Sequence, residues 1–199
     1  MPVVSWLRRT WVRFWLRRVK FTGRYGDLRR LYMIKDPWNL ANPDEQGRFR
    51  ECNRLIEELV PDCVSLLEVG CGEGLQTEHL LRVSQTVVGI DVSPIAIDRA
   101  RLRLKDVEFK IGRAEDAATL FPGRRFDLVT AFEVLYYASD IPMVIGVLQQ
   151  VGNTVLVTYF SERAAKMELH FTGDGWRRLD SISAGNTQWH CFVWSAPSL

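Results

Sequence analysis

Two acidic residues and three closely spaced glycines fall in the run Leu66 to Gly74, which reads Leu-Leu-Glu-Val-Gly-Cys-Gly-Glu-Gly. The run predicts a buried strand that ends in a tight turn and opens a helix, because glycine lets such a turn approach a ligand closely. A second apolar run, Thr86 to Ile90, ends in Asp91. An acid at the tip of that strand can bind two ribose hydroxyls. Together these residues predict a nucleoside-binding site.

The glycine spacing separates two classes of nucleoside ligand. Turns that bind dinucleotides usually read G-x-G-x-x-G, which frees a helix N-terminus to hold a pyrophosphate. Here Gly70, Gly72 and Gly74 give G-x-G-x-G, and Glu68 stands two residues before them. At this point the chain resembles the class I S-adenosylmethionine-dependent methyltransferases, whose first motif is E/D-x-G-x-G-x-G. The resemblance implies S-adenosylmethionine as cofactor and S-adenosylhomocysteine as product.

The resemblance also implies which residues contact the cofactor. Glu68 holds the turn and the ammonium of the methionine end, and Asp91 binds the ribose. In the loop after the third predicted strand, Arg113 stands where the family usually has an acid, so Ala114 and Glu115 are expected near the adenine instead. A solvent-exposed loop acid is the alternative for Glu115. The expected cofactor residues are Glu68, Gly70, Cys71, Gly72, Gly74, Asp91, Val92, Ser93, Ala114, Glu115 and Phe132.

The run Phe132 to Tyr137 reads Phe-Glu-Val-Leu-Tyr-Tyr and follows the fourth predicted strand. It resembles the nodulation-protein S (NodS-like) group, which N-methylates the amino sugar of a chitooligosaccharide, and Asp36-Pro37-Trp38 resembles that group's N-terminal pattern. Loops at the C-terminal ends of parallel strands line the ligand crevice. We therefore expect Glu133, Tyr136 and Tyr137 beside the transferred methyl, with Glu133 binding or deprotonating an amine. The alternative is that Glu133 caps a helix and the tyrosines belong to the core.

Two further residues are candidates near the acceptor. Tyr159 ends the fifth predicted strand, and His170 follows a short segment after it. The ordinary pKa of histidine suits a general base, so His170 is a candidate catalytic residue. A single histidine in an apolar context can equally be structural.

The amino-acid composition limits the classes of protein to which the chain can belong. The chain has 199 residues with 47% hydrophobic residues, which suits one domain with a real core. The four cysteines and three histidines lack metal-ligand spacing, so we expect reduced thiols, a cytoplasmic protein and no metal. No apolar run approaches the length of a membrane span.

The charge is divided unevenly along the chain. Residues 1–35 contain ten Arg and Lys and one acid, for a net charge of +9, whereas the remainder has 16 basic and 23 acidic residues, for −7. Residues 3–21 have the pattern of a cationic amphipathic helix with aromatic residues on its apolar face. Such a helix packs on its own domain or on a second subunit of a homodimer, or lies peripherally on an anionic membrane. Nucleic-acid binding is not expected, because the rest of the chain, residues 36–199, has a net negative charge.

From residue 64 on, strands and helices alternate. We predict strands at about 64–70, 85–91, 107–112, 126–132 and 154–160, and helices near 44–59, 74–83, 94–105 and 141–151. Asp44 is expected to cap the first of these helices and Ser93 the third. Two terminal strands, 176–184 and 187–196, flank Gly185-Asn186, which suits a type II′ turn.

The predicted fold is therefore an α/β Rossmann-like three-layer sandwich, with a seven-stranded, mostly parallel sheet and a C-terminal antiparallel β-hairpin. Residues 1–40 form a basic aromatic arm or lid, with aromatic side chains that stack on a sugar ring or simply pack. Residues 41–199 form the methyltransferase domain.

The expected function is transfer of a methyl group by in-line displacement to nitrogen or oxygen of a small-molecule or saccharide acceptor. Two alternatives remain. The first is a catalytically degenerate subunit that serves a partner, favoured by Arg113 and by the short segment before the hairpin. The second is a nicotinamide-dependent oxidoreductase, which the glycine spacing disfavours.

Overall fold

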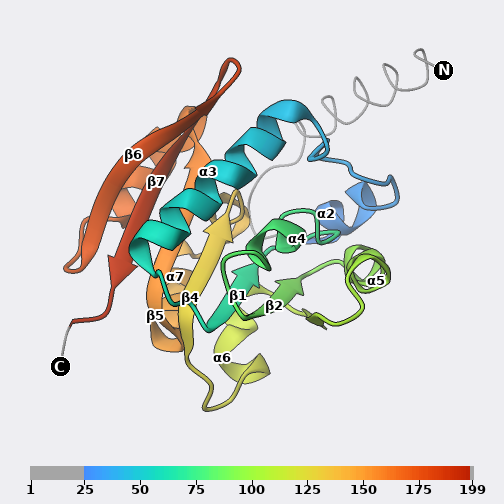
Figure 1. Ribbon diagram of the computed structural model, residues 1–199, viewed down its shortest axis with the longest axis horizontal. Coiled ribbons are helices and arrows are strands. Elements are labelled where there is room, and N and C mark those ends of the chain that lie inside the picture. Colours follow the sequence, from blue (N-terminus) through green and yellow to red (C-terminus); the bar gives the residue numbers. More distant parts are fainter. Residues whose placement is uncertain (1–24, 198–199) are drawn as a thin grey trace.

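A seven-stranded sheet forms the centre of the computed structural model, which describes residues 25–197 (Figure 1). The helix predicted at 3–21 lies outside the described residues. The strands are β1 (Ser65–Val69), β2 (Thr86–Asp91), β3 (Glu108–Ile111), β4 (Phe126–Phe132), β5 (Gly152–Phe160), β6 (Trp176–Ala184) and β7 (Thr187–Ser195). The helices are α2 (Tyr25–Leu31), α3 (Pro43–Leu59), α4 (Thr77–Leu80), α5 (Pro94–Arg103), α6 (Ala117–Leu120), α7 (Ile141–Val151) and α8 (Ala164–Met167). Short 3-10 turns are η1 (Ala114–Asp116), η2 (Leu135–Tyr137), η3 (Ser161–Arg163) and η4 (Glu168–His170).

The strand order is β3-β2-β1-β4-β5-β7-β6. The first five strands are parallel, β7 runs antiparallel to β5, and β6 runs antiparallel to β7. This confirms the predicted sheet and its terminal hairpin. The order reverses at β1, which has β2 on one side and β4 on the other. In open α/β sheets, ligands bind at such a switch point, beyond the carboxyl ends of the strands.

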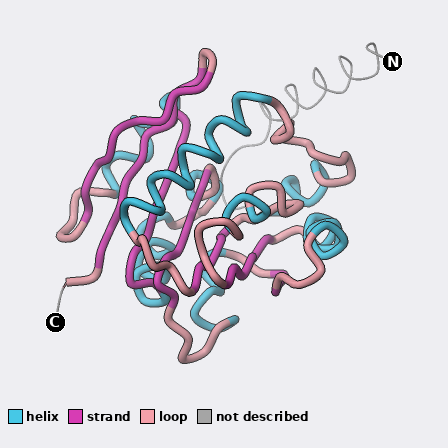
Figure 2. The backbone as a smooth tube through the Cα atoms, viewed as in Figure 1, coloured by secondary structure: helices cyan, strands magenta, loops and turns pink. Residues whose placement is uncertain are grey.

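Side chains along each strand alternate between the two faces of the sheet. This creates one core on each face, so the sheet lies between two layers of helices. On β5, Val155 and Val157 are buried in the core that α7 covers, whereas Leu156 is buried in the core that α3 covers. Successive side chains of a strand point to opposite faces, so a strand covered on both faces is apolar throughout. Figures 1 and 2 show α3 crossing in front of the sheet, with α7 behind it.

Helix starts and turns follow local chemistry. Ser93 caps α5 as predicted, since its hydroxyl accepts a hydrogen bond from the Ala96 amide. The predicted cap of α3 is wrong: the Asn42 side chain accepts bonds from the Asp44 and Glu45 amides, and Asp44 lies in the first turn. At the hairpin tip, Gly185 has φ +57°, the left-handed backbone that a type II′ turn requires at its first position.

The helix predicted at 74–83 is much shorter than expected. Only Thr77–Leu80 is helical, because Gly74 has φ +77° and so prolongs the turn. The other predicted elements agree with the structure within about two residues. Among residues 25–197, no helix has the length and apolar character needed to cross a membrane.

Candidate functional site

A cavity of about 950 Å³ opens where the sheet order reverses. The last residues of three strands, Val69 of β1, Asp91 of β2 and Phe132 of β4, contribute to its wall. A cavity of this size accommodates a cofactor together with a small acceptor. Within the described part of the chain, no group of His, Cys, Asp and Glu side chains is arranged to hold a metal ion.

The glycine turn after β1 exposes its backbone to this cavity. Gly70, Gly72 and Gly74 have φ of +76°, +54° and +77°, a region that other residues rarely adopt. A Cβ atom on Gly70 would lie 2.6 Å from Cγ2 of Val134, and one on Gly72 would lie 2.9 Å from the Tyr32 hydroxyl. Gly70 and Gly72 line the cavity together with the buried Cys71. Gly74 does not line the cavity and packs on Ala100 of α5 instead.

Asp91 joins the tip of β2 to the glycine turn. Its Oδ2 accepts a hydrogen bond from the Gly72 amide at 3.0 Å, and its Oδ1 accepts one from the Ser93 amide at 2.8 Å. Burial nevertheless raises the pKa of Asp91 to about 6. The carboxylate lines the cavity, so its remaining lone pairs are placed for a ribose. Ser93 itself is fully buried and is not part of the cavity wall.

Glu68 is a buried carboxyl group at the floor of the same region. Only 3% of the residue is exposed, and Oε2 accepts a hydrogen bond from the Thr77 hydroxyl. Burial raises the pKa of Glu68 to about 7, and the nearby charge of Arg48 opposes that rise. A cation in the cavity would stabilise the ionised carboxylate, which is what the ammonium of an amino acid offers. Glu68 is thus joined to the start of α4, and its predicted role toward the ammonium is chemically compatible with its position in the cavity wall.

Val92 and Ala114, which were expected near the adenine, line the cavity. Glu115 is not part of that wall; its carboxylate accepts a hydrogen bond from the Tyr25 hydroxyl at 3.2 Å. The guanidinium of Arg113 lies 5.2 Å from the centre of the Tyr25 ring. Arg113, which stands where the family usually has an acid, thus contacts Tyr25 of α2 and also lies 3.9 Å from the Glu115 carboxylate.

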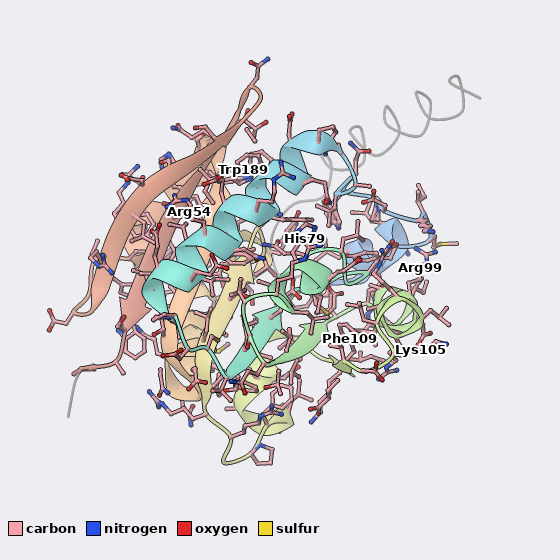
Figure 3. All side chains as sticks on the ribbon, viewed as in Figure 1. Arg54, His79, Arg99, Lys105, Phe109 and Trp189 are labelled. Atoms are coloured by element: carbon pink, nitrogen blue, oxygen red, sulfur yellow. The ribbon has the colours of Figure 1, made fainter. Side chains whose placement is uncertain are left out.

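The segment after α2 covers the glycine turn. Tyr32 is buried, and its hydroxyl accepts a hydrogen bond from Nε1 of Trp38 at 3.1 Å. The Asp36 amide donates to the carboxylate of Glu73, which is also paired with Arg99 at 2.6 Å. Arg99 projects from α5 toward this segment (Figure 3) and also donates to the Ile34 carbonyl at 3.1 Å. These contacts hold this segment, which is part of the predicted lid, against the glycine turn.

Glu133 stands at the acceptor end, directly after β4. Its φ of +57° is unusual for a residue with a side chain, and such strain is typical of functional positions. Its carboxylate accepts hydrogen bonds from the Thr158 hydroxyl and the Phe160 amide, both at 3.1 Å, and from the Tyr136 hydroxyl at 3.3 Å. Burial outweighs these donors and raises the pKa of Glu133 to about 7. This arrangement anchors the side chain in the cavity wall, and no helix cap involves it.

Three aromatic rings stand beside Glu133. The ring centres of Tyr136 and Tyr137 are 4.6 Å apart, and Trp38 lies 5.8 Å from Tyr137. All three line the cavity. They form an aromatic wall against which the apolar face of a sugar ring can pack.

Arg48, Glu45 and Gln76 also line the cavity and were not predicted from the sequence. Arg48 and Glu45 lie on α3, and their side chains form an ion pair with an N–O distance of 2.7 Å. Arg48 occupies the same helical stripe as Cys52 and Leu55, which are both buried. A charged residue within an apolar stripe is the signal that would have revealed it.

The structure does not bring His170 or Tyr159 to these residues. His170 lies on η4, outside the cavity wall, and partial burial with the nearby Lys166 lowers its pKa. Tyr159 is fully buried and stacks on Phe171 and Phe192. Tyr159 of β5, which was expected near the acceptor, therefore belongs to the core.

The sheet order, the glycine turn and the strand-tip acid define the class I methyltransferase fold. The family description "Nodulation protein S (NodS)" matches residues 22–158. The chain therefore belongs to the NodS family, and the predicted resemblance is confirmed.

Individual relatives are consistent with this family. Nodulation protein S of Sinorhizobium fredii (strain NGR234) is 37% identical over 120 residues, covering 60% of this chain and 55% of that protein. A ubiquinone biosynthesis O-methyltransferase of Thiobacillus denitrificans is 43% identical over 79 residues, covering 38% of this chain and 34% of that protein. The chain thus spans about half the length of the nodulation proteins it matches.

Among solved structures, the N-methyltransferase NodS of Bradyrhizobium japonicum WM9 in complex with S-adenosylhomocysteine superposes with a TM-score of 0.74 at 23% identity. The match covers 87% of this chain and 98% of that one. It supports the same fold.

Proposed function

We propose that this chain is an S-adenosylmethionine-dependent methyltransferase that methylates the amine of a small-molecule or saccharide acceptor. The observation that carries the proposal is Glu133, a carboxylate fixed in the wall of the cavity that also contains the glycine turn and Asp91. The residues present fit the cofactor, because a nucleoside needs the exposed turn and Asp91, and an ammonium needs Glu68. When bound, S-adenosylmethionine supplies an electrophilic methyl group on its sulfonium.

The acceptor nitrogen must present a lone pair, and an ammonium has none. A carboxylate with a pKa of about 7 is partly ionised at neutral pH and can take the ammonium proton. Glu133 would thus bind the ammonium, accept its proton and hold the amine in line with the methyl and the sulfur. Positioning of this kind supplies much of the rate in a displacement between two bound reactants.

The chemistry of the cavity wall supports a saccharide as the acceptor. Trp38, Tyr136 and Tyr137 offer an apolar surface beside a carboxylate, which suits a ring that carries an amine. Membership of the NodS family also supports a saccharide acceptor, because the chain resembles a group that N-methylates an amino sugar. A hydroxyl acceptor is the second candidate, because a matched relative is named as an O-methyltransferase.

A nicotinamide cofactor is less well supported. A pyrophosphate is usually held at the N-terminus of the helix that follows the glycine turn. Here that helix, α4, has four residues and begins after two further residues of turn. An assay of methyl transfer distinguishes the proposed enzyme from a partner subunit without catalysis.

The test is methyl transfer from labelled S-adenosylmethionine to chitooligosaccharides with and without one free amine, read by mass spectrometry. We expect methylation of the free amine alone, and Glu133→Gln should lower kcat/KM by about 10²- to 10⁴-fold. Glu162→Gln is the matched control, because Glu162 is exposed at the same cavity. Transfer to the acetylated sugar alone would favour an oxygen acceptor. S-adenosylhomocysteine binding without any transfer would favour the partner subunit.

Residues 3–21 lie outside the described part of the chain, so their membrane contact or role in a homodimer stays a prediction. Flotation of liposomes containing anionic lipid, with the full chain and with a chain lacking residues 1–22, tests the membrane contact. Equal binding of the two would contradict it.

A further inference from the structure

Arg48 is a buried cation with an unused donor in the cavity wall. Only 2% of the residue is exposed, and Nη1 has no hydrogen-bond partner within the described residues. An arginine has donors but no acceptors, and leaving a buried charged donor unpaired is costly. Because Arg48 is also part of the cavity wall, its guanidinium has donor capacity beside the space that a bound molecule would fill.

The guanidinium is held in place by its surroundings. Its Nε donates to Oε2 of Glu45 at 2.7 Å, and its central carbon lies 4.9 Å from the ring centre of Phe49 and 5.8 Å from that of Trp189. Figure 3 shows Trp189 beside α3, the helix that carries Arg48. A guanidinium fixed by one carboxylate and two rings presents its remaining N–H groups in a constant direction.

The charges in the wall indicate what the partner atom is. Glu45 neutralises Arg48, and Glu133 is left to bind a cation. The Arg48 charge also lowers the pKa of Glu133, so the two groups share one electrostatic environment. An additional anion here would face Glu45 and Glu133, whereas a neutral hydroxyl oxygen would accept from Arg48 without adding charge.

We propose that Arg48 determines acceptor specificity, by donating from its guanidinium to a hydroxyl oxygen that the acceptor carries near its amine. The role rests on the proposed function, in which Glu133 binds that amine. The enzyme would then select amino alcohols over plain amines of the same shape. Sites built to hydrogen-bond a substrate hydroxyl reject analogues that lack it, because the buried donor stays unpaired.

The test compares trans-2-aminocyclohexanol with cyclohexylamine, which differ by one hydroxyl. With the full chain and saturating S-adenosylmethionine, mass spectrometry gives kcat/KM for each amine. For the wild type we expect a preference of about 10- to 100-fold for the amino alcohol. Arg48→Met should bring that ratio close to one. Arg54→Met is the matched control, because Arg54 lies on the same helix and is exposed to solvent (Figure 3).

Two additional variants keep the test decisive. Arg48→Met leaves Glu45 buried without its cation, so the double variant Glu45→Gln/Arg48→Met removes both charges. Arg48→Lys keeps the charge but shortens the reach and loses the planar fork. S-adenosylhomocysteine binding by calorimetry shows that the variants are folded, and the ratio should fall in each of them.

A preference that survives in the folded variants would overturn the role of Arg48, even if both rates fall. Equal wild-type rates with the two amines would overturn it as well, while leaving the proposed function intact. A wild type that methylates neither these amines nor the amino sugar would contradict the proposed function, and with it the role of Arg48.

Discussion

The two halves of the cavity are built in different ways. The half proposed to bind the cofactor consists of Glu68, the glycine turn and Asp91, all within two adjacent strands and the turn after the first. The acceptor half consists of side chains from separate elements, among them Trp38, Arg48 and Glu133. In the first half, the backbone amides of Gly72 and Ser93 hold the Asp91 carboxylate. In the second half, two side-chain hydroxyls and one backbone amide hold the Glu133 carboxylate.

The difference means that the two halves tolerate change differently. A backbone site depends on φ angles and close packing, which few substitutions preserve. In a site built from side chains, residues can be substituted without changing the course of the backbone. We therefore expect variants of the first half to lose cofactor binding, and variants of the second half to change acceptor use while still binding S-adenosylhomocysteine.

The largest expected effect is that of Gly70→Ala. The new Cβ would lie 2.6 Å from Val134 Cγ2 at a φ of +76°, so the turn must move. Calorimetry should show S-adenosylhomocysteine binding weakened more than about 100-fold, consistent with strain and a clash together. Gly146→Ala on α7 is the matched control, since nothing lies within 4 Å of its added Cβ. That variant should bind normally and unfold at a higher temperature, because alanine favours a helix over glycine by about 1 kcal/mol. Normal affinity in Gly70→Ala would remove the distinction between the halves.

Asp91→Ala should weaken S-adenosylhomocysteine binding by about 100-fold. The change removes the acceptor for the Gly72 and Ser93 amides together with the carboxylate for the ribose, and charged hydrogen bonds contribute about 1.5–3 kcal/mol each. Calorimetry on Asp98→Ala gives the comparison, because the Asp98 side chain is 70% exposed. An Asp91 variant that binds as the wild type does would show that the turn alone holds the nucleoside.

Cofactor affinity should increase as pH rises from 5 to 8, by about tenfold or more. Burial raises the pKa of Glu68 to about 7 and that of Asp91 to about 6, so both are largely protonated at pH 5 in the free protein. The ammonium and the ribose prefer the ionised carboxylates, and binding therefore releases protons. Calorimetry across this range should show the rise, and Glu68→Gln should make it shallower. A flat profile would mean that neither carboxyl titrates on binding.

The smallest expected effect lies in the lid. Arg99→Ala breaks the ion pair with Glu73 and the bond to the Ile34 carbonyl, and should weaken S-adenosylhomocysteine binding by about three- to tenfold. Lys105→Ala, an exposed position in the loop after α5 (Figure 3), should have no effect. Should Arg99→Ala change acceptor preference instead of cofactor affinity, the contacts of Arg99 would serve to position Trp38 of the acceptor half rather than to hold the cofactor.

The contrast between a half built from the backbone and a half built from side chains also explains which features could be predicted from the sequence. The strands, the hairpin turn at Gly185 and the glycine turn at Gly70 depend on local backbone demands and on apolar patterning, and both are visible along the chain. Arg48 and Gln76 escaped prediction because their place in the cavity depends on how α3 and α4 pack against the sheet. The cap at Asn42 was missed because Asp44 offered the same chemistry two residues later. His170 was the reverse case, a suitable side chain that the fold keeps away from the cavity.

The tip of the hairpin has a consequence for how this protein can be redesigned. A Cβ on Gly185 would lie 2.7 Å from a carboxylate oxygen of Asp44, and one on Gly47 would lie 3.4 Å from Cβ of Ala184. The tip thus rests on the first turns of α3, the helix that presents Glu45 and Arg48 to the acceptor. An insertion in the hairpin would change this contact with α3 without replacing any residue of the cavity. Hairpin length is therefore a remote means of retuning substrate choice, and laboratory evolution could vary it while leaving every cofactor contact in place.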